Sequence, residues 1–356
     1  MAPVVQQLKR TAGVESFVCV TAQHRQMLDQ VLELFDIVPD VDLDLMRDDQ
    51  TLSQLSAAIF TSLDPVLREF RPDWVLVQGD TTTVAITALL AYYHRIKVGH
   101  VEAGLRTHDK WQPFPEEVNR RVAGVVADLH FAPTLWAKNN LLQEGVPERQ
   151  IALTGNPVID ALKVVTSQPE PEFVSSLLRK LDIGPKKKRL VLVTAHRREN
   201  FGQPLESICS ALGRLASRGD IEIIYPVHLN PNVQEPVHRL LDGQPHITLL
   251  PPLDYLPLVH LMKKSTLVLT DSGGIQEEAP AFGIPVLVMR EVTERPEGVE
   301  AGTLKLVGTD SDRIVSSAEH LLDDPAEYAR MARATNPFGD GHASERIVTA
   351  LLDYKN

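Results

Sequence analysis

The sequence is short of cysteine and of positive charge. Its 356 residues include two cysteines and 36 lysine and arginine residues against 47 aspartates and glutamates, a formal charge of −11. Because nucleic acids and membrane surfaces attract basic proteins, this balance argues against either partner. Cys19 and Cys209 stand alone in apolar segments, with neither a metal spacing nor a disulfide framework, which favours a reducing cytoplasm. No apolar run approaches 18 residues and nothing resembles a signal peptide, so we expect no membrane association.

Sequence motifs for cofactors are missing as well. No G-x-G-x-x-G follows a first strand, and neither G-x-x-x-x-G-K-[ST] nor a cluster with metal-ligand spacing occurs. The sequence therefore offers no motif evidence for nicotinamide, ATP or zinc, and we expect neither a cofactor nor a metal. An anionic ligand would need a local group of cations.

Short apolar runs alternate with helical segments along the whole chain. In the first half the runs fall at 17–21, 74–77, 97–101, 129–132 and 151–154. In the second half they fall at 190–194, 222–225, 247–250, 266–269 and 286–289. Length and alternation together predict two doubly wound α/β domains, 1–165 and 166–339, which face each other across a cleft. The last helix, within 340–356, is expected to pack back onto the first domain.

The segment 267–279, Leu-Val-Leu-Thr-Asp-Ser-Gly-Gly-Ile-Gln-Glu-Glu-Ala, predicts a strand, a tight turn and a helix. Gly273 and Gly274 allow the backbone to approach a phosphate, the helix N-terminus favours an anion, and Ser272 adds a hydroxyl. Glu277 or Glu278 could accept both hydroxyls of a ribose, which suggests a nucleotide. Alternatively, the glycines only close the turn and the glutamates complement the helix dipole.

Three carboxylates of the first half are candidates for acid–base chemistry. Asp80 and Glu102 each follow an apolar run, and Glu116 begins a helix after the next loop. Carboxylates that share one crevice suit general acid–base chemistry, because burial and crowding separate their pKa values. Each has a structural alternative: a helix cap for Asp80, a bond to a backbone turn for Glu102 and a favourable dipole contact for Glu116.

Candidate phosphate-binding residues occur in the second half. His196 ends the first strand there and is followed by two arginines, Arg197 and Arg198. A histidine at this place could contact a diphosphate or protonate a leaving oxygen, although it could equally be a structural residue. Arg295, with Glu294, follows a later strand and is a candidate for holding ribose or phosphate.

Taken together, the motifs resemble the non-hydrolysing UDP-N-acetylglucosamine 2-epimerases over essentially the whole chain. The matching runs are Thr-Ala-Gln-His-Arg at 21–25, Gly-Asp-Thr-Thr-Thr at 79–83, Gly-His-Val-Glu-Ala-Gly-Leu-Arg-Thr at 99–107, Pro-Glu-Glu-Val-Asn-Arg at 115–120, His-Arg-Arg-Glu-Asn at 196–200 and Asp-Ser-Gly-Gly-Ile-Gln-Glu-Glu at 271–278. The resemblance implies two Rossmann-like domains in the glycosyltransferase-B arrangement and a homodimer. It also implies reversible conversion of UDP-N-acetylglucosamine to UDP-N-acetylmannosamine, by elimination of UDP to a 2-acetamidoglucal and re-addition, without a cofactor.

The resemblance also assigns roles to residues. It implies acid–base roles for three carboxylates and a place beside the nucleotide for one histidine, namely Asp80, Glu102, Glu116 and His196. It implies a UDP site lined by Arg120, Ser272, Gly274 and Glu278. Some members bind a second substrate molecule as an activator through glutamines that match Gln23 and Gln26. Asp49 stands where they have an arginine, which argues against such regulation here.

One departure concerns the beginning of the chain. Family members begin with a strand, a Gly-Thr-Arg-Pro-Glu-Ala turn and a lysine, which would precede Met1 here. We therefore expect the first strand to be missing from the first sheet and a natural start upstream. Three other functions stay open at this stage: a UDP-dependent glycosyltransferase, a hydrolysing epimerase, and a sugar-nucleotide binding protein impaired in catalysis.

Overall fold

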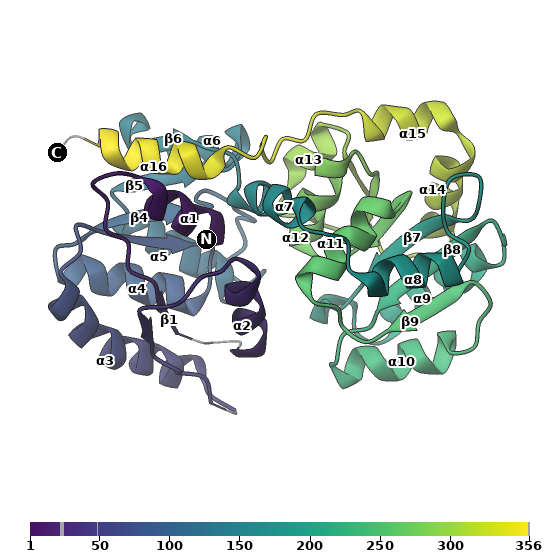
Figure 1. Cartoon of the computed structure of the whole chain (residues 1–356), viewed down its shortest axis with the longest axis horizontal. Helices are drawn as coiled ribbons and strands as arrows, with labels where there is room; N and C mark the ends of the chain where they lie inside the picture. Colours follow the sequence, from purple (N-terminus) through teal and green to yellow (C-terminus); the bar gives the residue numbers. More distant parts are fainter. Residues whose placement is uncertain (22–24, 48, 355–356) are drawn as a thin grey trace. The chain divides into compact units, whose positions relative to one another are not determined.

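The computed structural model describes residues 1–21, 25–47 and 49–354, which divide into two compact units (Figure 1). The first unit contains residues 1–161 and 338–356, and the second contains 162–337. The chain first passes from one unit to the other inside a helix, α7 (Pro157–Ser167). For that reason no loop marks the boundary, which we predicted from the sequence at 165/166.

The second unit contains a six-stranded parallel sheet with the order β12-β11-β10-β7-β8-β9. Its strands are β7 (Arg189–Thr194), β8 (Ile221–Pro226), β9 (Ile247–Leu250), β10 (Leu267–Thr270), β11 (Val286–Val288) and β12 (Leu304–Leu306). This is the doubly wound order, in which the chain starts at the centre and moves outward in both directions. The direction reverses between β7 and β10, and ligands of such sheets bind outside the carboxyl ends of the strands at that point.

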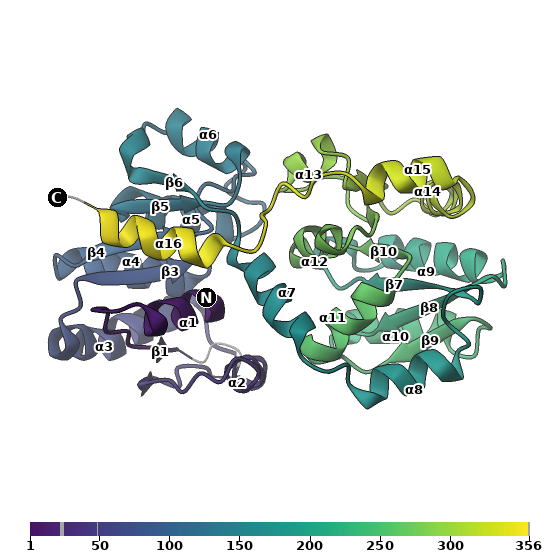
Figure 2. The same cartoon turned by 45° about the horizontal axis from the view of Figure 1, so that its top comes forward.

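Helices cover both faces of this sheet (Figure 2). They are α8 (Glu172–Lys180), α9 (Gln203–Ala216), α10 (Pro231–Leu241), α11 (Tyr255–Lys264), α12 (Gly273–Glu278), α13 (Pro296–Glu300), α14 (Ser311–Asp323) and α15 (Pro325–Ala332), with short 3₁₀ turns at Arg198–Asn200 and Ala279–Phe282. Strand residues alternate between the two cores: Val191 packs with α9 and α14, whereas Leu192 packs with α8 and α11. Burial on both faces explains why the strands are almost continuously apolar.

The first unit contains a four-stranded parallel sheet with the order β3-β4-β5-β6, and a separate parallel pair, β1-β2. The strands are β1 (Cys19–Val20), β2 (Val41–Asp42), β3 (Trp74–Gln78), β4 (Lys97–Val101), β5 (Leu129–Ala132) and β6 (Ile151–Leu153). Among the described residues, β1 pairs only with β2 and β3 only with β4. Within the described ranges β4 and β5 are paired on both sides, whereas β1, β2, β3 and β6 each have one unpaired edge.

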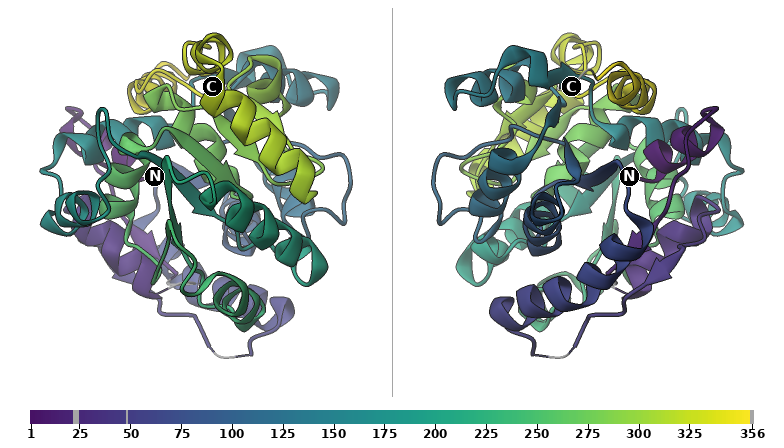
Figure 3. Two further views of the ribbon diagram at one scale, coloured as in Figure 1. Left: turned by 90° about the vertical axis from the view of Figure 1, so that its right-hand side faces the viewer. Right: turned by 90° about the vertical axis from the view of Figure 1, so that its left-hand side faces the viewer.

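The helices of the first unit are α1 (Ala2–Arg10), α2 (Arg25–Leu34), α3 (Leu52–Phe70), α4 (Thr82–Tyr93), α5 (Glu116–Val126), α6 (Leu135–Gln143), α7 and α16 (Ala343–Asp353), with a 3₁₀ turn at Glu148–Gln150. Helices α3 and α4, dark blue in Figure 3, pack against each other. The final helix α16 lies beside α1, and its Ile347 joins Val4 and Phe131 in one core cluster. The end of the chain thus completes the first unit.

The predicted α/β class and the Rossmann-like character of both units are confirmed. The buried strand predicted at 17–21 is wrong in extent, since β1 covers two residues and Phe17 is 48 % exposed. The short strands β2 and β12 escaped prediction because each has only two or three residues. No helix of the described ranges is long and apolar enough to cross a lipid bilayer.

Candidate active-site residues in two half-sites

Asp80 lies directly after β3, at the carboxyl edge of the first sheet, and forms an ion pair. Arg120 Nη2 is 2.5 Å from Asp80 Oδ2, and Asn119 Nδ2 donates to the Asp80 carbonyl oxygen at 2.9 Å. Arg120 is only 4 % exposed, so this charge-assisted bond is weakly screened by water. The helix-cap alternative for Asp80 is wrong, because the hydroxyl of Thr81 caps α4 by accepting from the Val84 N–H.

Glu102 follows β4 and adjoins the same turn. Its backbone has φ of 64°, a left-handed conformation that is uncommon outside glycine and clusters at functional sites. Gln78 Nε2 donates to Glu102 Oε2 at 3.3 Å, and a Cβ on Gly79 would lie 3.8 Å from that oxygen. The loop beyond is held closely: a Cβ on Gly104 would come within 2.2 Å of the Ala137 carbonyl oxygen. Glu102 therefore lies beside the Gly79–Asp80 turn.

Glu116 is the first residue of α5, as predicted from the sequence. Its Oε2 is buried and has no hydrogen-bond partner among the described residues. Such an atom is costly unless a ligand or water supplies a donor. Glu116 and Arg120 lie one helical turn apart on α5, so they share a face. Since Arg120 contacts Asp80, the three predicted carboxylates gather around one turn.

Glu117, which sequence reasoning missed, organises this half-site. It is fully buried, and its two oxygens accept backbone N–H bonds from Thr107 and His108 at 3.1 and 3.2 Å. Arg120 Nη1 also lies 3.3 Å from Glu117 Oε2. One carboxylate thus ties the loop after Glu102 to the arginine that contacts Asp80.

His100, a second residue that we missed, contacts the Gly79–Asp80 turn. It lies on β4, is 1 % exposed, and its Nε2 is 2.8 Å from the Gly79 carbonyl oxygen. Burial lowers the pKa of His100 to about 4, and does the same to its cross-strand neighbour His130. A neutral ring must donate from Nε2, because the carbonyl can only accept. The signal available in the sequence was a histidine within each of two otherwise apolar strands.

The half-site of the second unit is built at the junction of β10 and α12. Ser272 is the N-cap residue of α12, yet its hydroxyl makes no capping bond. A Cβ on Gly273 would lie 2.6 Å from Arg295 Nη1, so any larger residue there would displace the Arg295 guanidinium. A Cβ on Gly274 would meet nothing within 4 Å, so this position faces open space. Packing within the chain therefore does not explain why position 274 is a glycine.

His196 lies two residues after the end of β7, at the reversal point of the sheet next to β10. Asp271, fully buried, accepts the backbone N–H groups of His196 and Arg197, both at 2.9 Å, and Asn200 Nδ2 at 3.0 Å. The His196 ring stacks on His228, with centroids 5.4 Å apart and planes inclined by 15°. Burial lowers the pKa of His196, although Asp271 opposes the shift. Asp271 is a positioning residue to which sequence reasoning assigned no role.

Arg295 is held by carboxylates of its own unit. Its Nε lies 2.6 Å from Glu277 Oε1 and its Nη1 lies 2.8 Å from Glu294 Oε1. Arg290 Nη1 donates to the other Glu294 oxygen at 2.9 Å. Burial by itself would raise the pKa of Glu294, but the two arginines outweigh it and lower that pKa to about 2. The charge of Arg295, predicted to hold ribose or phosphate, is thus largely matched within the protein.

Glu278 ends α12, and so does not lie in its first turn, where the predicted alternative of a contact with the helix dipole would require it. A favourable contact with the dipole at the helix N-terminus is therefore excluded for this residue. The Tyr255 hydroxyl donates to Glu278 Oε1 at 3.0 Å, and Glu278 is 6 % exposed. Burial raises the pKa of Glu278 to about 7, even though Tyr255 and Arg295 act in the opposite direction.

The predicted regulatory residues receive no test from the structure. Gln23 lies outside the described residues, and so does the side chain of Gln26. Asp49 is exposed, in a turn with φ of 53°. The activator site stays a prediction from the resemblance.

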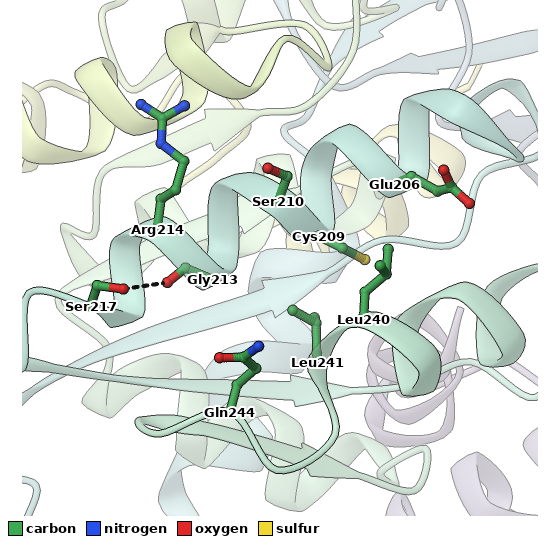
Figure 4. A pocket seen from close by; sticks show the side chains of 9 residues that line it. All are labelled: Glu206, Cys209, Ser210, Gly213, Arg214, Ser217, Leu240, Leu241 and Gln244. Carbon is green, nitrogen blue, oxygen red and sulfur yellow. Dashed lines mark hydrogen bonds between the residues drawn. The ribbon is translucent and has the colours of Figure 1, made fainter.

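Across 1–21, 25–47 and 49–354, no three His, Cys, Asp or Glu side chains are grouped to hold a metal ion. A groove between α9 and α10 is lined by Glu206, Cys209, Ser210, Gly213, Arg214, Ser217, Leu240, Leu241 and Gln244 (Figure 4). It contains none of the predicted residues, and burial raises the pKa of the Cys209 thiol to about 12, which makes it unreactive.

The first Rossmann-like unit carries clustered carboxylates. The second carries a histidine and a glycine turn at the reversal point of its sheet. These features place the chain in the class of glycosyltransferase-B-like enzymes. A family model described as UDP-N-acetylglucosamine 2-epimerase matches residues 6–352. The chain therefore belongs to the UDP-N-acetylglucosamine 2-epimerase family.

Individual relatives agree with this assignment. The chain is 54 % identical to the UDP-N-acetylglucosamine 2-epimerase of Escherichia coli K12, over 99 % of this chain and 94 % of that protein. Among solved structures, it resembles the Neisseria meningitidis enzyme bound to UDP-GlcNAc, with a TM-score of 0.92, 46 % identity and coverage of 99 % and 96 %. It also resembles the Methanocaldococcus jannaschii enzyme in complex with UDP-GlcNAc and UDP, with a TM-score of 0.82, 32 % identity and coverage of 99 % and 95 %.

Proposed function

We propose that the chain interconverts UDP-N-acetylglucosamine and UDP-N-acetylmannosamine by inverting carbon 2 of the sugar. The observation that carries the proposal is the grouping of Asp80, Glu102 and Glu116 around one turn of a chain of this family. A glycosyltransferase needs an acceptor site instead, and three carboxylates at one turn do not supply one.

The carboxylates would move the carbon 2 proton. In the forward direction, a carboxylate accepts this proton while the bond between carbon 1 and the diphosphate oxygen breaks, and its electron pair leaves with UDP. The 2-acetamidoglucal then takes a proton on the opposite face of carbon 2 and UDP re-adds at carbon 1. Two positioned groups on opposite faces are needed, and Glu116, with one buried oxygen unpartnered among the described residues, is a candidate for one of them. No electrons are gained or lost overall, so the reaction itself calls for no redox cofactor.

The second half-site would hold UDP. A neutral His196, supported by Asp271, can donate a hydrogen bond to the diphosphate, where negative charge develops as the bond breaks. Ser272 offers an unused hydroxyl and Gly274 an open approach for phosphate, and Glu278 would accept the ribose hydroxyls. Arg295 is assigned to a supporting position in this half-site and Arg120 to one beside Asp80 in the first unit, because both arginines are paired with carboxylates.

An NMR time course with UDP-N-acetylglucosamine in deuterated water tests the function. We expect UDP-N-acetylmannosamine to form, with deuterium at carbon 2 of both sugars at equilibrium. Free N-acetylmannosamine with UDP would identify a hydrolysing enzyme instead. Binding of UDP-N-acetylglucosamine without any exchange or product would identify a sugar-nucleotide binding protein.

We propose in addition that the chain forms a homodimer through the first unit. Tyr92, Tyr93 and Val125 are 60 %, 62 % and 85 % exposed near the ends of α4 and α5, two helices that pack together. Large exposed apolar side chains on neighbouring helices favour a protein partner. Light scattering should give twice the chain mass, and Val125→Glu should shift the protein toward a monomer.

The proposed location is the cytoplasm. Cys19 and Cys209 are both free cysteines, as expected for a reducing compartment. Fractionation of cells that produce the protein, with a known cytoplasmic enzyme as the marker, tests this location.

A further inference from the structure

A tyrosine hydroxyl and a glutamate carboxylate of the second unit form a hydrogen-bonded pair, and the tyrosine has been given no role so far. Tyr255, the first residue of α11, donates its O–H to Glu278 Oε1 at 3.0 Å. No other side-chain hydrogen bond reaches the Glu278 carboxylate from the described part of the chain, and 6 % of the residue stays accessible. The second oxygen, Oε2, is therefore left for a ligand.

We propose that the Tyr255 hydroxyl positions the Glu278 carboxylate for the ribose of the UDP-sugar, and that this pair makes nucleotide-sugar binding dependent on pH. The inference rests on the proposed function, because it takes Glu278 as the ribose-binding group. Tyr255 acts through Glu278 and is thus a positioning residue, not a group that touches the reacting atoms.

The charges around Glu278 explain why one neutral hydroxyl matters. The groups that face it are Tyr255 from α11, Glu277 from α12 and Arg295 from the segment before α13. Arg295 is engaged by Glu277 and Glu294, at 2.6 and 2.8 Å, so it matches the charge of Glu278 only in part. Burial dominates and raises the pKa of Glu278 to about 7, where a single hydrogen bond decides how much carboxylate is present.

The ionised and the protonated carboxyl differ as ligands for ribose. A carboxylate only accepts hydrogen bonds and suits two hydroxyl donors, whereas a carboxylic acid has a donor of its own and accepts more weakly. Binding should therefore tighten as the pH rises through 7. A hydroxyl that donates to Glu278 stabilises the carboxylate, and its removal should move the tightening to higher pH.

The experiment is calorimetric titration with UDP-N-acetylglucosamine at pH 6, 7, 8 and 9, because its doubly esterified diphosphate keeps the same two negative charges over this range. For Tyr255→Phe we expect a dissociation constant raised about tenfold at pH 6, about fivefold at pH 7 and less than twofold at pH 9, if the lost bond stabilises the carboxylate about tenfold. Tyr328→Phe removes the hydroxyl of a half-buried tyrosine on α15 that does not hydrogen-bond to Glu278, and should change nothing.

A double-mutant cycle distinguishes an effect that acts through Glu278 from a general loss of packing. In a Glu278→Gln background, Tyr255→Phe should have no pH-dependent effect, because the group through which it acts is gone. A Tyr255→Phe effect equal at all four pH values, or no effect, would overturn the inference, since loosened packing weakens binding independently of pH. If the unsubstituted chain fails to bind UDP-N-acetylglucosamine at any pH, the proposed function itself is wrong.

Discussion

Arg120 approaches Asp80 to 2.5 Å and Glu117 to 3.3 Å, so one guanidinium bridges a candidate catalytic carboxylate and a fully buried one. Arg120 and Glu117 come from α5, whereas Asp80 lies at the end of β3. The bridge therefore holds the first turn of α5, which begins with Glu116, against the turn that carries Asp80. Geometry at the candidate site depends on this bridge.

Removing one carboxylate of the trio should abolish most of the turnover. For Asp80→Asn, Glu102→Gln and Glu116→Gln we expect turnover to fall by about 100- to 10,000-fold each, the usual contribution of a positioned acid or base. Dissociation constants for UDP-N-acetylglucosamine should change far less. Glu148→Gln, at an exposed site of the same unit, is the matched control. A near-normal rate in any of the three variants would remove that residue from the mechanism.

Glu117→Ala should destabilise the first unit. It removes the buried partner of Arg120 and leaves the Thr107 and His108 N–H groups unsatisfied, a loss of about 3 kcal/mol or more. Equilibrium urea unfolding measures it. Glu148→Ala breaks the pair with Lys138, in which the glutamate is 72 % exposed, and should leave the midpoint almost unchanged. Equal midpoints for the two variants would contradict the account of Glu117.

The buried histidines predict a loss of stability in acid. The pKa values of His100 and His130 are about 4 in the folded chain, below the ordinary 6.5, so the unfolded chain binds their protons first. Their contribution is complete above pH 6.5 and is lost as the pH falls from 6.5 toward 4. The loss is on the order of 3 kcal/mol for each histidine.

Urea unfolding at pH 7 and pH 5 tests this dependence. His100→Gln, whose amide can still donate to the Gly79 carbonyl oxygen, should flatten the difference between the two pH values, and His130→Gln should do the same. His238→Gln, at an exposed site on α10, should leave the difference unchanged. An unaltered pH dependence in both buried-site variants would show that these rings are not the source.

Asp271 should prove essential for the second half-site. Its carboxylate accepts three N–H groups, and an asparagine would present an amide donor to some of them. For Asp271→Asn we expect kcat/KM to fall about 10- to 100-fold, consistent with the loss of one or two bonds to a charged group. Asp312→Asn, at a position that is 85 % exposed in the same unit, serves as the control. Equal activity of the two variants would show that Asp271 does not position His196.

The unpaired edges of β1 and β3 predict a response to an added strand. We expect an N-terminal extension with an apolar strand and a Gly-Thr-Arg-Pro-Glu-Ala turn to raise both the melting temperature and the turnover, by pairing these edges and adding cations. The control is an extension of equal length made of glycine and serine. Equal behaviour of the two extended proteins would show that the edges do not accept a strand.

Local sequence determined the elements and much of the candidate site. Near-continuous apolar runs such as Leu190 to Val193 predict parallel strands, because only burial on both faces tolerates them. Helix patterns between the runs predict the doubly wound class. Polar residues directly after strands, such as Asp80 and Glu102, could be placed at one sheet edge because all parallel strands end there.

Only the tertiary structure decided which side chains contact one another. Asp80 and Arg120 are separated by 40 positions, Tyr255 and Glu278 by 23, and no local pattern links either pair. The same holds for Asp271, which neither periodicity nor spacing distinguishes from a loop aspartate. A pKa such as that of Glu278 depends on burial and on the charges brought around it, and these arise when separate elements pack. Propensity and hydrophobic period act over a few residues, whereas site chemistry depends on distances that the packing of the whole unit sets.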